Sequence, residues 1–344
     1  MDRPILVTGA AGFIGAAVTR CLLERGDTVV GVDNFNSYYN PALKRARLAR
    51  LEQLPGAAER FRSVPIDVEN GAALAELFAR ERPRGVVHLA AQAGVRYSIE
   101  NPAAYIQSNL VGFGHILEGC RHHGVEHLVY ASSSSVYGGN RAMPFSEQQP
   151  VNHPVSLYAA TKKANELMAH TYSHLYGLPA TGLRFFTVYG PWGRPDMAPM
   201  LFARAILAGE PIRVFNHGRM QRDFTYIDDI VQGVIRCLDK PATADPAFDP
   251  LQPNPATAAV PHRLFNIGNA QPTELLRFIS VLEQALGREA IQDLQPMQPG
   301  DVVATAADTS ALEAWVGFRP STSIEQGVGA FARWYRDVYV PMVA

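Results

Sequence analysis

The feature that most constrains the fold is a glycine-rich turn near the start of the chain. The apolar run 5–7 predicts a buried strand, and residues 16–25 predict a helix. Between the two, glycines recur every three residues, at Gly9, Gly12 and Gly15. Such glycines let the backbone turn tightly and approach a pyrophosphate, which then lies on the helix N-terminus. Strand, turn and helix together predict a dinucleotide-binding site.

Short apolar runs continue through the first half of the chain and alternate with helical stretches, one of them at 103–120. Continuous apolar strands separated by helices predict a parallel sheet that is covered on both faces. The predicted fold class is therefore α/β, a doubly wound parallel sheet of Rossmann type. The runs expected to form its further strands are 28–32, 61–66, 86–89, 127–131 and 183–188.

The pattern changes after about residue 190, where shorter elements follow a Pro/Gly-rich loop, including a helix at 200–208 and a strand at 213–215. We predict a dinucleotide-binding core over 1–185 and a smaller α/β substrate domain mainly over 186–344, with some segments returning to the core. Residues 242–261 contain five prolines and predict a mobile surface loop.

Charge and cysteine content exclude several classes of protein. The 344 residues carry 31 Lys and Arg against 32 Asp and Glu, so no basic excess indicates nucleic acid or an anionic membrane. Cys21, Cys120 and Cys237 are odd in number and far apart, which predicts neither a zinc site nor a redox pair and fits a reducing compartment. We expect no signal sequence, no membrane span and no metal, and hence a soluble cytoplasmic protein.

Two carboxylates follow predicted strands of the core. Asp33 can accept both hydroxyls of an adenosine ribose and would repel a 2′-phosphate, which favours NAD over NADP. Asp67 follows the run 61–66 and either accepts from the adenine amino group or caps a turn or helix. Leu89 and Ala91 end another strand, where small residues suit either a close cofactor or plain packing.

Tyr158 and Lys162 lie four residues apart, so a helix places them on one face. A lysine ammonium, helped by the positive nicotinamide ring, lowers the pKa of a nearby phenol, and a tyrosinate can then remove a hydroxyl proton during hydride transfer. The serines of 132–135 follow a predicted strand and could bridge substrate and tyrosine. Each pattern alone also fits a solvated helix face or a serine-rich turn, but together with the glycine turn they predict hydride-transfer chemistry.

In these motifs the chain resembles the extended short-chain dehydrogenase/reductase family. The successive marks are TGAAGFIG at 8–15, HLAAQ at 88–92, SSSSVYG at 132–138 and YAATK at 158–162. Longer blocks resemble the UDP-glucuronate 4-epimerases, and the likeness runs through most of the chain except 242–261. These blocks are 33–47, 93–102, 183–198, 222–231 and 300–328.

The resemblance implies a tightly bound NAD that is regenerated in each cycle, and a UDP-sugar substrate held mainly by residues 186–344. It makes Tyr158 the catalytic base, Lys162 its electrostatic partner and Ser133 the bridging hydroxyl. Besides Tyr158 and Lys162, the positions that match NAD contacts are Gly9, Gly12, Phe13, Ile14, Gly15, Asp33, Asn34, Asp67, Val68, Leu89, Ala91 and Asn109. Those that match or are candidates for substrate contacts are Arg96, Ser132, Ser133, Ser134, Thr187, Arg194, Arg222 and Asp301.

Arg194 is a candidate for holding the sugar carboxylate, because a guanidinium pairs with carboxylates in a bidentate way. The alternative is that it only stiffens a Pro/Gly loop. The implied reaction interconverts UDP-glucuronate and UDP-galacturonate through a 4-keto intermediate. A UDP-glucuronate decarboxylase, a 4-epimerase of neutral UDP-sugars and a non-catalytic NAD sensor remain open. The resemblance also implies a homodimer, for which helices 103–120 and 158–176 are candidates.

Overall fold

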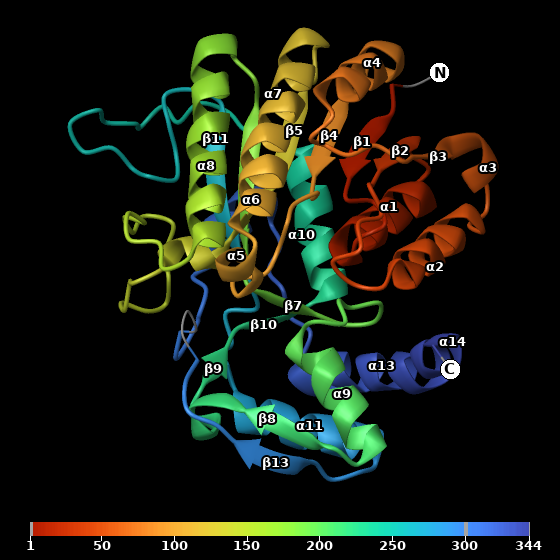
Figure 1. Cartoon of the computed structure of the whole chain (residues 1–344). Helices are drawn as coiled ribbons and strands as arrows, with labels where there is room; N and C mark the ends of the chain where they lie inside the picture. The colour runs from red at the N-terminus through yellow and green to blue at the C-terminus, as the bar shows by residue number, and fades with distance from the viewer. Residues whose placement is uncertain (1–2, 299–301, 344) are drawn as a thin grey trace.

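The computed structural model describes residues 3–298 and 302–343. Within these residues, seven strands form one sheet in which every neighbouring pair is parallel (Figure 1). In sheet order they are β11 (His262–Ile267), β6 (Ala180–Phe185), β5 (His127–Ser133), β4 (Gly85–His88), β1 (Ile5–Thr8), β2 (Val29–Val32) and β3 (Phe61–Val64). The strand order reverses at β1, so the predicted doubly wound α/β sheet of Rossmann type is confirmed.

Helices cover both faces of this sheet because side chains alternate along each strand. In β1, Ile5 and Val7 face one side and Leu6 the other, and all three are buried. One face carries α1 (Phe13–Arg25), α2 (Pro41–Glu52), α10 (Ile227–Asp239) and α12 (Ser310–Val316). The other carries α4 (Gly71–Glu81), α7 (Gly112–His122) and α8 (Leu157–Tyr176). Both faces being buried explains why the strand sequences are continuously apolar.

A second layer lies beyond the carboxyl ends of the sheet strands, in the lower part of Figure 1. Its own apolar core centres on Phe278, whose ring stacks on that of Phe224 with centroids 4.4 Å apart. The elements around this core are α9 (Ala198–Ala208), β8 (Pro211–Val214), α11 (Leu275–Leu286), β13 (Ile291–Leu294), α13 (Ile324–Trp334), η4 (Tyr335–Tyr339) and α14 (Val340–Val343).

The prediction of a single strand over 183–188 is wrong, because the chain changes sheets at Phe186. The Phe186 amide still donates to Ile267 of β11, but the next amide, Thr187, donates to the Asp223 carbonyl. From there β7 (Thr187–Tyr189) pairs in parallel with β10 (Phe224–Tyr226) in the second layer. One residue therefore links the two sheets.

Asp223, at this crossing, ties three distant segments together. It is fully buried, and its carboxylate accepts from the backbone amides of Asn269, Ala270 and Ala307 at 2.7–3.0 Å. Charged hydrogen bonds of this kind are among the stronger ones in proteins. The short strands beside it, β9 (Gln221–Arg222) and β12 (Thr273–Glu274), pair with each other.

The helical stretch predicted at 103–120 is helical but not uniform. It consists of α6 (Pro102–Tyr105), the π-helical turn η1 (Ile106–Val111) and α7, preceded by α5 (Tyr97–Glu100). The remaining short helices are α3 (Ala57–Arg60), η2 (Ser134–Tyr137) and η3 (Phe215–Gly218). The stretch 242–261 holds turns, and an isolated bridge joins Thr257 to Arg263 at its end.

Two searches of the described ranges, 3–298 and 302–343, are negative. In them, no helix combines the length and apolarity that crossing a membrane requires. The same ranges contain no group of three or more His, Cys, Asp or Glu side chains that could hold a metal ion.

Candidate active site

A cavity of about 1100 Å³ lies where the carboxyl ends of the sheet strands face the second layer. This is the place where ligands bind in open α/β sheets, at the reversal of strand order. Most of the predicted site residues line it. They are Gly9, Gly12, Phe13, Ile14, Gly15, Asp33, Asn34, Val68, Leu89, Ala91, Arg96, Ser132, Ser133, Ser134, Tyr158, Lys162, Thr187, Arg194 and Arg222.

The glycine turn at one end of the cavity has no room for side chains. Gly9 has φ +71°, and a Cβ there would come within 2.9 Å of the Ala90 amide nitrogen. A Cβ on Gly15 would overlap the Gly9 carbonyl. The turn therefore packs closely between β1, β4 and α1, and leaves the N-terminus of α1 open toward the cavity, as pyrophosphate binding requires.

Asp33, at the end of β2, is held in a fixed position beside this turn. One carboxylate oxygen accepts from the Ala11 amide at 3.1 Å, and the other accepts from the Phe35 amide at 2.8 Å. Lys44 approaches it to 3.7 Å from α2. A fixed carboxylate at this point can accept ribose hydroxyls, so the residues present fit the adenosine half of NAD.

Two predicted NAD contacts, Asp67 and Asn109, are not among the residues that line the cavity. Asp67 accepts from the Asn34 side chain at 2.8 Å and from the Glu69 amide. Asn109 is buried, and its amide group both donates to and accepts from the Gln92 backbone. In this structure the two side chains hold loops that line the cavity: Asp67 binds Asn34, and Asn109 binds the backbone of Gln92.

The predicted catalytic group is assembled from two elements. Ser156 caps α8 by accepting from the Ala159 amide, so Tyr158 and Lys162 lie on the first turns of the helix and face the end of β5. Burial raises the pKa of the Tyr158 phenol above its ordinary value, and a hydrogen bond with Ser133 and the charge of Arg194 offset only part of this rise. The arrangement thus brings a hydroxyl, a phenol and a guanidinium together in one cavity.

Lys162 is fully enclosed on the same side of the cavity. Its ammonium donates to the Ala131 carbonyl at 3.1 Å. Burial lowers the pKa of Lys162 to about 8. Close to neutral pH the ammonium can therefore be charged, as the role predicted for it from the sequence requires.

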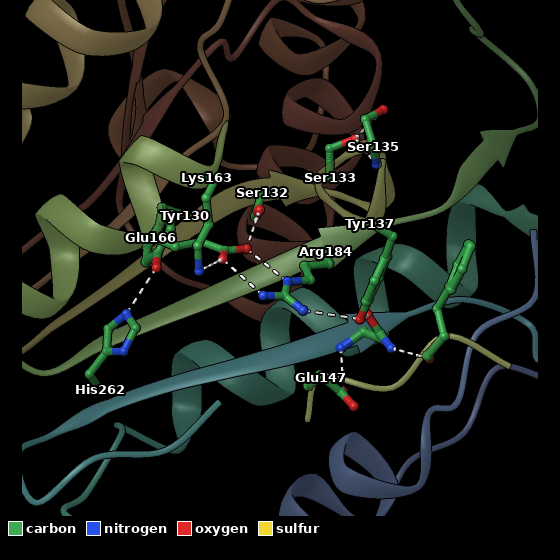
Figure 2. A network of polar contacts seen from close by, with 12 residues as sticks. Tyr130, Ser132, Ser133, Ser135, Tyr137, Glu147, Lys163, Glu166, Arg184 and His262 are labelled. Carbon is green, nitrogen blue, oxygen red and sulfur yellow. Dashed lines mark hydrogen bonds and ion pairs between the residues drawn. The ribbon is translucent and has the colours of Figure 1, made fainter. Parts of the chain in front are cut away.

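The serine run divides its hydroxyls between two tasks (Figure 2). Ser133 donates to Ser135 and accepts from its amide, next to Tyr158. Ser132 instead donates to Glu166 at 2.7 Å. Ser134 lines the cavity. Of the neighbouring serines, Ser133 is thus the one with a hydrogen bond to the phenol.

Glu166 belongs to a buried ion pair that the sequence predictions do not include. Arg184 donates to both of its carboxylate oxygens, at 2.8 and 2.9 Å, and also to the Tyr137 hydroxyl at 3.1 Å (Figure 2). Burial alone would raise the pKa of Glu166, but the charge of Arg184 outweighs it and the pKa lies below its usual range. The sequence signal that could have revealed this ion pair is a charged residue, Arg184, inside the apolar strand β6.

Arg194 enters the cavity from the loop after β7. Its Nε donates to Asp196 at 3.0 Å, and the Tyr38 hydroxyl donates to the same carboxylate at 3.1 Å. Burial raises the pKa of Asp196, but Arg194 outweighs this and lowers it overall. Thr187 lines the cavity on β7. Asp196 and Tyr38 were not predicted as site residues. Asp196 is a local partner, two residues from Arg194, whereas the contact of Tyr38 with Asp196 depends on the tertiary fold.

The remaining substrate candidates lie at the second-layer end of the cavity. The Arg96 guanidinium lies over the Phe215 ring at 5.2 Å from its centroid. Arg222 donates to the carbonyls of Gln221 and Val303. The predicted contact Asp301 lies outside the described residues.

Comparisons with known proteins agree with this geometry. Residues 5–250 match the NAD dependent epimerase/dehydratase family. The chain is 47% identical to a probable UDP-glucuronate 4-epimerase of Rhizobium meliloti, with 97% of each chain covered. It is 48% identical to UDP-glucuronate 4-epimerase 3 of Arabidopsis thaliana, covering 97% of this chain and 77% of the relative.

A solved structure shares the whole fold. It is the UDP-glucuronic acid 4-epimerase of Bacillus cereus in complex with UDP-glucuronic acid and NAD, which superposes with a TM-score of 0.85 at 32% identity and covers 98% of this chain and 100% of its own. The chain described here therefore belongs to the NAD-dependent epimerase/dehydratase family.

Proposed function

We propose that this protein is an NAD-dependent UDP-glucuronate 4-epimerase, which interconverts UDP-glucuronate and UDP-galacturonate. The observation that carries the proposal is the meeting of Ser133, Tyr158 and Arg194 in one cavity, where a proton acceptor and a carboxylate binder face the same space. The names of the relatives and of the structural neighbour support it. NAD, when bound, takes up the hydrogen from C4 of the sugar with its electron pair and later returns it.

The side chains of the protein move the proton and orient the sugar. Tyr158, as the tyrosinate, accepts the proton of the 4-hydroxyl, directly or through the Ser133 hydroxyl to which it is bonded. The Lys162 ammonium stabilises that tyrosinate. The 4-keto sugar turns about its phosphate bonds and presents the other face of C4, and Tyr158 then returns the proton to the same oxygen, O4.

A 4-keto uronate is a β-keto acid, and it loses CO₂ most easily when the bond to the carboxylate is perpendicular to the carbonyl plane. An epimerase must hold the carboxylate away from that geometry. We propose that Arg194 does so together with Thr187, because both line the cavity and a guanidinium fixes a carboxylate in two directions. Asp196 and Tyr38 in turn fix the guanidinium.

We further propose a cytoplasmic homodimer. The three cysteines are free, and two of them are buried, which fits a reducing compartment. Exposed apolar side chains on the two candidate dimer helices support the association. They are Ile106 and Val111 on η1 and Leu167 and Leu175 on α8. A monomer mass in light scattering would refute the dimer.

We also propose that residues 1–185 form the NAD-binding core, joined by the returning elements α10 and β11, and that most of 186–344 binds the UDP-sugar. The support is that α10 and β11 pack with the large sheet, whereas α9, α11 and α13 share a separate core.

The test is to incubate the purified protein with UDP-glucuronate, without added NAD, and to follow the sugar by NMR. Formation of UDP-galacturonate without CO₂ is expected, and would also show that NAD is carried by the protein. A UDP-pentose as the main product would instead make it a decarboxylase. No reaction, even with NAD added, would refute the proposal and direct the assay to neutral UDP-sugars, and failure on those as well would leave an NAD sensor.

A further inference from the structure

Arg47 on α2 is a buried cation that takes no part in the proton transfers. The residue is 2% exposed, yet in the described part of the chain no carboxylate receives its hydrogen bonds. Instead Nη1 donates to the Ala11 carbonyl at 3.1 Å and to the Tyr39 hydroxyl at 2.8 Å. Nε and Nη2 donate to the Trp192 carbonyl at 3.1 and 2.6 Å, and Nη2 also to that of Gly193.

These contacts join two loops that are far apart in the sequence. Ala11 lies in the glycine turn that faces the cofactor end of the cavity, and its amide also binds Asp33. Trp192 and Gly193 directly precede Arg194, which faces the sugar end. One guanidinium thus connects the backbone at the cofactor end of the cavity to the backbone at the sugar end.

The backbone at Trp192 needs such a partner. Its φ of +66° lies in the left-handed region, where a residue other than glycine is strained and is kept only by its surroundings. Two nitrogens of Arg47 hold the carbonyl of that same residue. Because the next residue but one is Arg194, the strained turn sets the direction from which that guanidinium enters the cavity.

We propose that Arg47 is a positioning residue for product choice: by fixing the Trp192–Gly193 turn to the glycine turn, it sets where Arg194 holds the sugar carboxylate relative to the cofactor. The proposal rests on the proposed function. When the carboxylate is misplaced, the C5–C6 bond of the 4-keto uronate breaks, CO₂ leaves, and the electron pair forms an enolate that takes a proton at C5. A displacement of about 1 Å is enough to change rates on the order of 100-fold.

The experiment compares Arg47→Lys with the wild type on UDP-glucuronate labelled with ¹³C at C6. UDP-galacturonate and labelled CO₂ are measured together, and their ratio is the readout. Arg47→Lys keeps the charge but cannot hold two carbonyls in a planar fork. We expect epimerisation to fall at least about 10-fold and the CO₂ released per epimer formed to rise at least about 10-fold.

Arg50→Lys is the matched control, since Arg50 lies on the same helix and its guanidinium lies over the face of the Trp192 ring, 5.5 Å from the centroid, without bonding to a backbone carbonyl of the described loops. Its product ratio should equal that of the wild type. A folded Arg47→Lys enzyme with an unchanged ratio, whatever its rate or thermal stability, would overturn the proposal and leave Arg47 a purely structural role.

If Arg47→Lys does not fold, Arg47→Gln decides, because its neutral amide buries no charge and cannot hold the Ala11 and Trp192 carbonyls together as the guanidinium does. A rise in CO₂ per epimer supports the proposal, and an unchanged ratio in that variant overturns it. Failure of the proposed function is recognised separately, since the wild type itself would then form no UDP-galacturonate.

Discussion

Replacing Arg184 by Met should destabilise the protein strongly and in a pH-dependent way. Arg184 is 0% exposed and Glu166 is 1% exposed, and two parallel hydrogen bonds join them. Methionine fills a similar volume, so the main loss is the charge and its donors. The Glu166 carboxylate would keep only Ser132 and Lys163, which donate at 2.7 and 3.2 Å.

The expected magnitude follows from this burial. Removing one partner of a buried pair costs about 3–5 kcal/mol when it leaves an uncompensated charge, and the remaining Lys163 ion pair places the loss toward the lower end of that range. At roughly 2.1 cal/mol/K per residue, unfolding the whole chain carries about 0.7 kcal/mol/K of entropy. The melting temperature should therefore fall by about 4–7 °C at pH 8.

The sign of the pH dependence distinguishes an electrostatic loss from a packing loss. In the wild type the pKa of Glu166 lies below its usual range, so the pair stabilises above the ordinary pKa of a glutamate and loses this as the pH falls through the lowered value. In the variant, burial raises the pKa of Glu166 without opposition from Arg184. The carboxyl then becomes neutral more readily, and the destabilisation should be smaller at pH 5 than at pH 8.

The assay is thermal unfolding at both pH values for Arg184→Met, Glu166→Gln and the double variant. The double variant should lose less than the sum of the single ones, since it leaves no unpaired charge. A loss that is additive and equal at pH 5 and pH 8 would refute the assignment of the stability to the ion pair.

Three further predictions concern activity. Tyr158→Phe should fold and bind NAD but lose at least about 100-fold in turnover. The control is Tyr172→Phe on the same helix, whose hydroxyl donates to Glu118 and whose loss should leave turnover unchanged. Near wild-type turnover in Tyr158→Phe would show that Tyr158 is not the base. Because burial lowers the pKa of Lys162 to about 8, activity should decline as the pH rises through about 8. Lys162→Arg should move this decline in the pH–rate profile to higher pH, since a guanidinium stays charged. A decline at an unchanged pH would show that another group titrates. Arg194→Ala should slow epimerisation and increase UDP-pentose, measured by NMR, and an unchanged product ratio would remove Arg194 from the carboxylate site.

The parts of the fold and site that could be predicted are those coded by neighbours in sequence. The strand, glycine turn and helix at the N-terminus form one contiguous signal, and Tyr158 and Lys162 need only a helix to meet. The end of β5 could be placed because a parallel sheet brings all carboxyl ends to one edge.

What could not be predicted depends on partners distant in the chain. Periodicity indicates that a position is buried, but not that Arg184 meets Glu166 or that Arg47 meets the Trp192 carbonyl. Within the block 33–47, the likeness to a family gives roles to Asp33 and Asn34 but none to Arg47. The break at Phe186 was missed for the same reason, since apolar residues continue through it and only the partner strand changes.

The single residue between β6 and β7 has a consequence for engineering this protein. With so short a tether, and with Asp223 bonded to two other segments, the loop that carries Arg194 cannot be repositioned independently of the sheet that carries Ser133. Attempts to give the enzyme a new sugar preference by single exchanges at Thr187 or Arg194 would leave the backbone around these two residues in the position that suits the old substrate. Replacing the whole segment 187–226, from the start of β7 to the end of β10, by that of another family member would instead change this backbone together with the residues that set sugar specificity.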